Sequence, residues 1–133
     1  MTGNAVFKIA SWNETPYSEV QEGGKLTRAS VTKSYTSDIQ GEGVLEYLLT
    51  YFADGSAQFI GLERVTGQLG GRTGSFIFEH TGSFKNGNMN QKSIIVANSG
   101  TGELTGLSGE STLDAGHQQE YPFTFEYKFE LEV

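Results

Sequence analysis

The sequence predicts an all-β fold: a single closed antiparallel β-barrel of about eight strands. Apolar and polar residues alternate with a period of two along most of the 133 residues, and turn-forming segments separate these runs. No long window has a helical period. A chain of this length with so many short strands favours closure, because a barrel has no edge strands. A two-sheet sandwich is the alternative architecture.

The last strand shows the alternation most clearly. In "FTFEYKFELEV" the aromatic residues and Leu131 share one face, while Thr124 and the charged residues share the other. Glycine, with 18 residues, fits frequent tight turns and bends, and only 2 prolines interrupt the pattern. "GELTGL" is expected to form one short helical turn. The predicted strands are residues 4–13, 26–38, 43–53, 56–66, 73–83, 89–97, 108–114 and 122–132.

Composition indicates one domain over residues 1–133 and excludes several functional classes. The chain has no cysteine, which excludes a disulfide scaffold and a thiolate metal site. A net charge of −7 with scattered basic residues argues against nucleic-acid binding. With only 2 histidines, we expect no metal site. No cofactor is expected either, because no glycine-rich stretch matches a phosphate loop or a dinucleotide fingerprint. No apolar run is long enough to span a membrane and "MTGNAVFKIASWN" is not a signal peptide, so a cytoplasmic protein is expected.

A hairpin is predicted over residues 44–65, "VLEYLLTYFADGSAQFIGLERV". Asp54-Gly55 is typical of a two-residue type I′ turn. That loop would place Glu46 directly opposite Glu63. Both faces of the hairpin are substantially apolar, so one can fill a barrel while the other needs a cover. In a chain with few helices that cover would be another subunit, so we expect a homo-oligomer.

The facing glutamates form the first candidate site. Two opposed carboxylates repel each other, and a desolvated one would hold a proton near neutral pH, as a general acid or base requires. Alternatively, both side chains project to solvent, or Arg28 or Arg64 compensates their charge. A register change of one residue would separate them.

Polar residues on the other face form the second candidate site. Arg64, Tyr47, Tyr51 and His80 would be polar groups in an otherwise apolar lumen, if that face lines the barrel. Such an interior suits a small, mainly apolar ligand with one acidic or hydrogen-bonding end. Alternatively, Arg64 forms a salt bridge at the barrel mouth and His80 is a satisfied core residue.

Three glycine-containing stretches carry a family resemblance: "KLTRASVTKSYTSDIQGEGVLEYLLTY", "GLERVTGQLGGRTGSFIFEHTGSF" and "SGTGELTGLSGE". They resemble DUF3224, a bacterial family of unknown function, over nearly the whole chain. The resemblance implies a small barrel of the allene oxide cyclase type, loosely called lipocalin-like, with possible oligomerisation through its outer wall. Asn13, Glu14 and Pro16 lie where the plant cyclases have a polar cluster. Ser11 stands where the catalytic glutamate would be expected, so the resemblance assigns no activity.

Three functions remain open from the sequence. The leading hypothesis is binding of a small apolar or amphipathic molecule in the barrel lumen, with Arg64, Tyr47, His80, Tyr51 and Arg28 as polar contacts. The second is a cofactor-free isomerase or cyclase that uses Glu46 or Glu63 as acid or base. The third is a protein-protein interaction module that uses only its outer wall.

Overall fold

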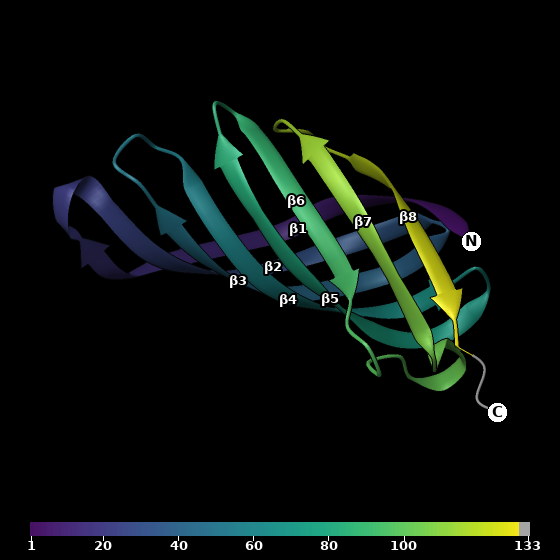
Figure 1. Cartoon of the computed structure of the whole chain (residues 1–133). Coiled ribbons are helices and arrows are strands. Elements are labelled where there is room, and N and C mark those ends of the chain that lie inside the picture. The colour runs from purple at the N-terminus through teal and green to yellow at the C-terminus, as the bar shows by residue number, and fades with distance from the viewer. Residues whose placement is uncertain (131–133) are drawn as a thin grey trace.

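Eight antiparallel strands form one sheet that returns on itself in this computed structural model, which describes residues 1–130 (Figure 1). Each strand pairs with its neighbours in sequence, and β8 pairs with β1. The strands are β1 (Thr2–Val20), β2 (Gly24–Ser37), β3 (Ile39–Tyr51), β4 (Ala57–Leu69), β5 (Arg72–Lys85), β6 (Asn88–Ile95), β7 (Leu107–Ala115) and β8 (Tyr121–Phe129). Two short 3-10 turns, η1 (Gln21–Gly23) and η2 (Gly102–Leu104), complete the described fold.

The predicted all-β class and all eight predicted strands are confirmed, and the short turn expected in "GELTGL" is η2. The largest difference is in β1, which was expected over residues 4–13 and continues to Val20. This strand has irregular pairing between Ile9 and Ser11 and again between Pro16 and Ser18. Such bulges interrupt the alternation that sequence reasoning depends on. Residues 131 and 132 of the last predicted strand lie outside the described residues.

The β3–β4 hairpin differs from its predicted register by one residue. The backbone N–H of Phe52 donates to the carbonyl of Ser56, so the loop has three residues, Ala53 to Gly55, rather than two. Gly55 has a φ of 87°, which glycine adopts without the cost of a Cβ. Leu45 therefore faces Glu63, and Glu46 faces Leu62. The predicted Glu46–Glu63 pair is wrong, because a one-residue shift moves one of the two carboxylates to the other face.

The ring of strands is longer on one side than on the other. Only residues 2–7 of β1 pair with β8, while residues 8–20 of β1 pair with β2 alone among the described residues. We call residues 8–20 of β1, together with their partners in β2, the extension. It projects beyond the short strands β6, β7 and β8 at the left of Figure 1. The extension forms one wall of a cavity inside the ring.

The interior of the ring is apolar at both ends and polar between them. The larger core cluster includes Phe76, Phe78 and Phe125, and the smaller one includes Val31 and Leu45. Several polar side chains are also buried among the described residues, which is unusual without partners. They are Thr27, Lys33, Glu63, Ser75, His80, Gln91, Ser93 and Ser111.

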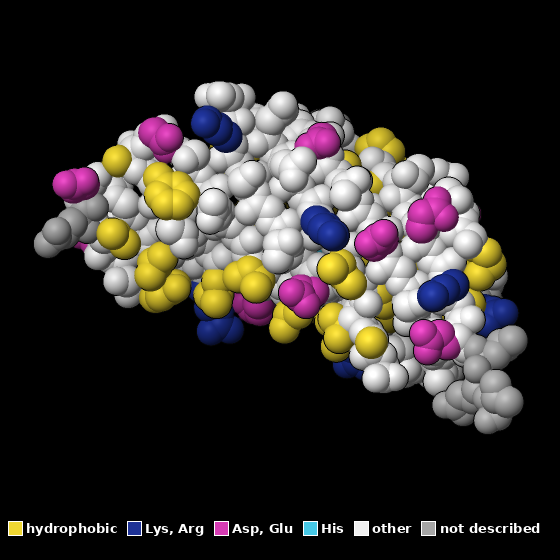
Figure 2. Space-filling view, in the orientation of Figure 1, with side chains coloured by type: hydrophobic (Ala, Val, Ile, Leu, Met, Phe, Trp, Pro, Cys, Tyr) yellow, Lys and Arg dark blue, Asp and Glu magenta, His cyan; other side chains and the backbone are white. Residues whose placement is uncertain are grey.

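The outer surface mixes charges of both signs with exposed hydrophobic side chains, some of which lie next to one another on the face drawn in Figure 2. On the β3–β4 hairpin the exposed large hydrophobic residues are Val44, Leu48, Ile60 and Leu62 on the strands and Phe52 beside the loop. Within the part of the chain that the structure describes, no helix has the length and apolar character needed to cross a membrane.

Candidate functional site

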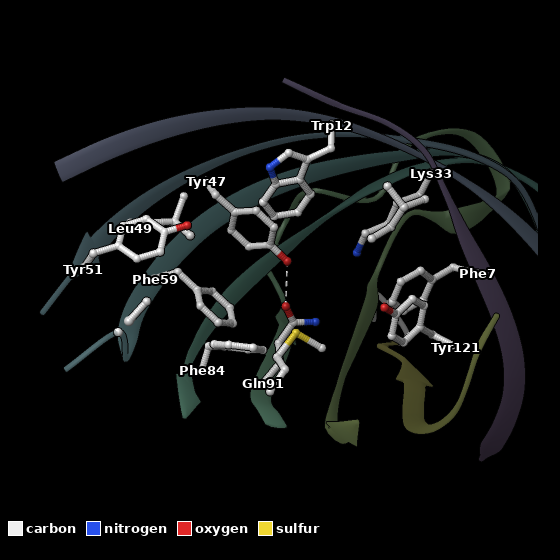
Figure 3. Close-up of a pocket in the computed structure, with 14 residues that line it drawn as sticks. Phe7, Trp12, Lys33, Tyr47, Leu49, Tyr51, Phe59, Phe84, Gln91 and Tyr121 are labelled. Atoms are coloured by element: carbon white, nitrogen blue, oxygen red, sulfur yellow. Dashed lines mark hydrogen bonds between the residues drawn. The ribbon is translucent and has the colours of Figure 1, made fainter. Parts of the chain in front are cut away.

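A cavity of about 290 Å³ lies inside the ring, where the extension overhangs the shorter strands. Its walls are mostly aromatic and aliphatic (Figure 3). Phe7 and Tyr121 stack at one end with ring centroids 4.8 Å apart, and Leu49 and Tyr51 lie at the other. The lining residues are Phe7, Ile9, Trp12, Lys33, Tyr47, Leu49, Tyr51, Gly55, Ala57, Phe59, Phe84, Met89, Gln91 and Tyr121.

Aromatic contacts hold the wall formed by β1, β3 and β4. Tyr47 packs edge-on against Phe59, with ring centroids 5.1 Å apart, and lies 5.8 Å from the ring of Trp12. These residues face inward because alternate residues of a strand share one face. Trp12 is the only tryptophan of the chain and is 43% exposed. The cavity therefore has a built-in fluorescent side chain that solvent still reaches.

One set of polar groups, on Lys33, Tyr47 and Gln91, forms what we call the floor of the cavity. The Tyr47 hydroxyl donates to Gln91 Oε1 at 2.7 Å, which joins β3 to β6 across the ring. The Lys33 ammonium, on β2, is 4.1 Å from the centre of the Phe7 ring. Both Lys33 and Gln91 are 3% exposed. The floor thus combines a buried cation with a buried amide.

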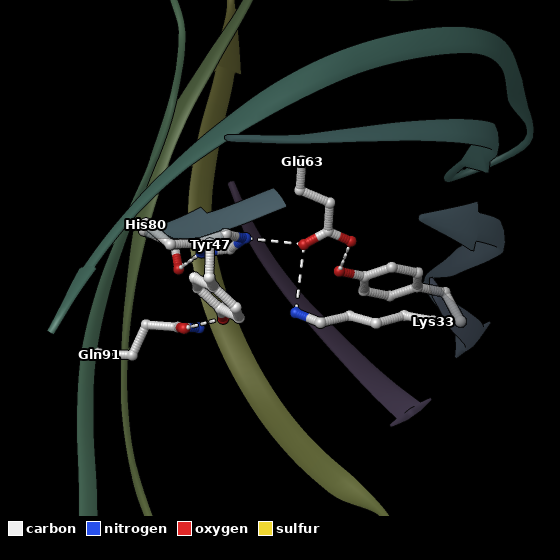
Figure 4. Close-up of polar contacts among 7 residues, drawn as sticks. Lys33, Tyr47, Glu63, His80 and Gln91 are labelled. Atoms are coloured by element: carbon white, nitrogen blue, oxygen red, sulfur yellow. Dashed lines mark hydrogen bonds and ion pairs between the residues drawn. The ribbon is translucent and has the colours of Figure 1, made fainter. Parts of the chain in front are cut away.

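Directly beside the floor lies a buried hydrogen-bonded group that we call the floor cluster: Lys33, Tyr35, Glu63, His80 and Ser93 (Figure 4). Glu63 Oε1 accepts from Lys33 Nζ at 3.1 Å and from His80 Nε2 at 2.7 Å. Its Oε2 accepts from the Tyr35 hydroxyl at 2.6 Å. Because a carboxylate only accepts, His80 carries its proton on Nε2, and Nδ1 pairs with Ser93 Oγ at 2.7 Å.

The charges of the floor cluster follow from these contacts. Burial alone would raise the pKa of Glu63, but the Lys33 charge and the hydrogen bonds from His80 and Tyr35 lower it to about 2. Burial lowers the pKa of His80, and the nearby Lys33 charge lowers it further, against the opposing effect of Glu63. Burial and Glu63 raise the pKa of Tyr35. At neutral pH the cluster therefore holds one ion pair, Lys33 with Glu63, and a neutral imidazole.

Two glycines make room for this arrangement. A Cβ on Gly43 would collide with Glu63 Oε2, and a Cβ on Gly61 would come within 2.6 Å of the Tyr47 ring. Both glycines face inward on the hairpin, and a side chain at either position would displace a polar group from the interior. Neither glycine has a left-handed backbone conformation. Glycine is therefore required at these positions because there is no space for a side chain.

A second polar group lies at the outer end of the cavity, on the extension. Glu14 accepts from Thr27 and from Tyr51 through Oε2, at 2.7 and 2.6 Å, and from Trp12 Nε1 at 3.0 Å through Oε1. Burial opposes ionisation of Glu14, but the hydrogen bonds from Tyr51, Thr27 and Trp12 outweigh it and lower the pKa. Burial and Glu14 raise the pKa of Tyr51 to about 12. These contacts fix Tyr51 and Trp12 against the cavity.

The structure separates the residues that sequence reasoning put forward for one site. Tyr47 and Tyr51 line the cavity, and His80 lies in the floor cluster. Arg64 instead lies exposed on the outer face of β4, because the three-residue loop reverses the predicted parity of that strand. Arg28 is also exposed on the outer face, where its Nε is 3.2 Å from Glu46 Oε2. Because Arg64 and Arg28 both lie on the outer face, the predictions that they contact a ligand in the interior are wrong.

The two glutamates proposed as acid or base also have different positions. Glu46 faces solvent beside Arg28 and Ser30, whose hydrogen bonds lower its pKa. Glu63 is buried, but it does not line the cavity and both of its oxygens are occupied. A pKa of about 2 keeps Glu63 ionised at neutral pH, so it has no proton to donate as a general acid.

Sequence reasoning missed Lys33, Gln91 and Trp12 as site residues. A signal for Lys33 exists in "TRASVTKSY", where it shares the alternation of Ala29 and Val31 and so falls on the apolar face. A lysine on such a face is a candidate buried cation. Gln91 has no comparable signal, because "NMNQKSII" contains polar residues on both faces. Among the described residues, no group of three or more His, Asp and Glu side chains is placed to hold a metal ion.

Comparisons with known proteins agree on a family. The family model described as "Protein of unknown function (DUF3224)" matches residues 3–127. A crystal structure of a DUF3224 protein of unknown function from Shewanella oneidensis MR-1 is similar, with a TM-score of 0.82 and 29% sequence identity. The match covers 99% of this chain and 100% of that one. A search of curated proteins gives no match. The resemblance inferred from the glycine-containing stretches is confirmed, and the chain belongs to the DUF3224 family.

Proposed function

We propose that this protein binds a small, mainly apolar molecule in the cavity beneath the extension. The observation that carries the proposal is an accessible cavity of about 290 Å³ with aromatic walls and a few convergent polar groups at one end. Ligand sites typically combine these features, at volumes of about 300–1,000 Å³. The volume lies just below the lower end of that range, so the ligand is a compact molecule or a short chain.

We infer further that the ring acts as a closed barrel of the allene oxide cyclase type, with this cavity as its lumen. The pairing of β1 with β8 over residues 2–7 supports this architecture. The fixed tyrosines at the wall support a largely pre-formed site, because Tyr47 and Tyr51 already donate to Gln91 and Glu14. A pre-formed site loses less conformational entropy when a ligand binds.

The first experiment is native mass spectrometry on gently purified protein, followed by organic extraction and identification of any released molecule. Independently, Trp12 fluorescence is titrated with short-chain apolar probes, since this side chain lines the cavity and is the only tryptophan. We expect saturable changes in Trp12 emission and a rise in melting temperature. Saturable binding that leaves Trp12 unchanged would place the ligand elsewhere and contradict the proposal.

A matched pair of variants locates the binding. Phe84 is 41% exposed and lines the cavity, whereas Ile94 is 43% exposed and does not. Phe84→Glu should weaken binding because it places a carboxylate at the apolar wall, and Ile94→Glu should leave binding unchanged. Equal effects of the two substitutions would show that binding does not depend on this cavity.

A second candidate function is self-association through the outer face of the β3–β4 hairpin, defined by Val44, Leu48, Ile60 and Leu62. These side chains are 61%, 50%, 50% and 58% exposed, and Leu48 lies opposite Ile60 in the sheet. Contiguous exposed apolar residues of this kind mark interaction surfaces. Arg28 and Arg64 lie on the same face as Glu46, so a second copy can offer opposite charges to each.

Sedimentation velocity at several concentrations tests the self-association. We expect an oligomer for the wild type and a monomer for Leu62→Glu, whereas Ile94→Glu serves as a control of the same charge on β6. A wild type that stays monomeric at high concentration would contradict this candidate.

A further inference from the structure

The floor of the cavity presents hydrogen-bond donors that the protein itself does not use. An ammonium group has three N–H donors. Among the described residues, Lys33 has one hydrogen bond, to Glu63, and one aromatic contact, with Phe7. Gln91 accepts from Tyr47 through Oε1, and no described residue accepts from its Nε2. Of the described side chains, only Ser108 has a fully buried polar atom without a partner, so the Gln91 amide is open to the cavity.

Free acceptors are scarce at the same place. No aspartate or glutamate is among the described residues that line the cavity. The Trp12 indole N–H and the Tyr51 hydroxyl, which line the wall, both donate to Glu14. A ligand group that reaches the floor therefore meets donors from Lys33 and Gln91 whose hydrogen bonds a ligand oxygen can accept.

The charge balance of the floor decides whether that group is ionised. Lys33 is already paired with Glu63 at 3.1 Å, and both side chains are almost completely buried. The pair is neutral as a whole, and His80 adds no charge because its imidazole is neutral. A ligand carboxylate would lose its hydration without a further positive charge to compensate it, which is strongly unfavourable in a buried site. An uncharged acceptor avoids that cost.

We propose that the cavity selects an uncharged amphipathic molecule with a carbonyl oxygen, such as a ketone, aldehyde, ester or amide, and that this oxygen accepts hydrogen bonds from Lys33 Nζ and Gln91 Nε2. The apolar remainder of the molecule packs between Trp12, Phe59 and Phe84. This inference rests on the proposed binding function and names its ligand class. Lys33 and Gln91 are the specificity-determining residues.

The experiment compares three probes of similar length by Trp12 fluorescence. Octan-2-one carries the carbonyl, 2-methyloct-1-ene replaces its oxygen by a methylene group, and octanoate is ionised at neutral pH. We expect octan-2-one to bind about tenfold more tightly than the alkene, as a hydrogen bond to a charged donor implies. We expect octanoate to bind more weakly than octan-2-one at neutral pH.

Variants then identify the donors. Lys33→Met alone would leave the buried Glu63 carboxylate without its cation. The double variant Lys33→Met/Glu63→Gln is therefore used, because it removes both charges together. Likewise Tyr47→Phe/Gln91→Leu removes both partners of one hydrogen bond. In each double variant the ratio of the two affinities, octan-2-one over the alkene, should decrease severalfold, whatever the change in the affinity for the alkene itself. A merely structural role would weaken both probes equally.

The outcomes separate this inference from the proposed function. Equal affinities for the ketone and the alkene would overturn the carbonyl assignment while leaving apolar binding intact. Tighter binding of octanoate than of octan-2-one would overturn the assignment of an uncharged head group. If none of the probes changes Trp12 emission, both the assignment and the binding proposal fail.

Discussion

Glu63 and Glu46 lie on the same hairpin, both within an ion pair, yet in opposite environments. Glu63 is inside the ring beside Lys33, with side-chain exposures of 0% and 3%. Glu46 is outside beside Arg28, with exposures of 46% and 63%. The N–O distances, 3.1 and 3.2 Å, are nearly the same. The pairs therefore differ in solvation rather than in geometry, and solvation decides what each contributes to stability.

The largest loss of stability is expected from breaking the inner pair, Lys33 with Glu63. Lys33→Met leaves the Glu63 carboxylate buried with only His80 and Tyr35 as partners, so the free energy of unfolding should fall by about 3–5 kcal/mol. Urea denaturation at pH 7 measures it. The double variant Lys33→Met/Glu63→Gln should recover much of the loss, because it leaves no buried charge. A double variant as unstable as the single one would show that packing, not charge, holds this region.

The inner pair also predicts an acid-dependent loss of stability. The pKa of Glu63 is about 2 in the folded protein, below its ordinary value of 4.5, so its stabilisation is complete above the ordinary pKa. It is lost as the pH falls from about 5 toward 2, by roughly 3 kcal/mol in total. The measurement is the free energy of unfolding against pH.

The control for this pH dependence is the same double variant. Glu14, Glu46 and Asp54 also have lowered pKa values, so both proteins lose some stability in acid. The free energy of unfolding of the wild type minus that of Lys33→Met/Glu63→Gln should fall as the pH is lowered from about 5 toward 2. A constant difference would mean that Glu63 titrates normally.

A smaller loss of stability is expected when the space around Glu63 is filled by an added methyl group. Gly43→Ala places a methyl group against Glu63 Oε2, so the unfolding free energy should fall by about 1–3 kcal/mol. Gly116→Ala is the control, since its Cβ would meet only ordinary contacts at 3.6 Å or more. Thermal melts of both variants give the comparison. Equal melting temperatures would show that Glu63 has room to move.

The smallest loss of stability is expected from breaking the outer pair, Arg28 with Glu46. Arg28→Ala removes the partner of Glu46, but both groups are well solvated, so the loss should be at most about 1 kcal/mol and should shrink further in high salt. Urea denaturation at low and high salt checks it. A loss as large as that of Lys33→Met would remove the distinction between the inner and outer pairs.

Particular residues show how far the sequence predicted this site. The sequence predicts an apolar lumen on the hairpin face of Tyr47 only if that face is the inner one, and the structure buries Leu45, Tyr47 and Leu49 on it. Arg64 was misplaced, because β4 has apolar residues on both faces and only the loop length decides which face is inside. The carboxylate that turned out to be buried, Glu63, was identified as a candidate, but its partners were not. Lys33 and His80 are far from it in sequence, and no pattern within one strand indicates contacts across the ring.

The sequence by itself determined the all-β class and the eight strands except the second half of β1, because alternation and turn residues are local properties that each segment expresses on its own. The glycine-containing stretches determined the family. Only the tertiary structure decided which glutamate is buried and that Lys33, His80 and Tyr35 surround it. Those contacts depend on register and on closure of the ring, where a difference of one residue in a loop exchanges the inside and the outside of a strand.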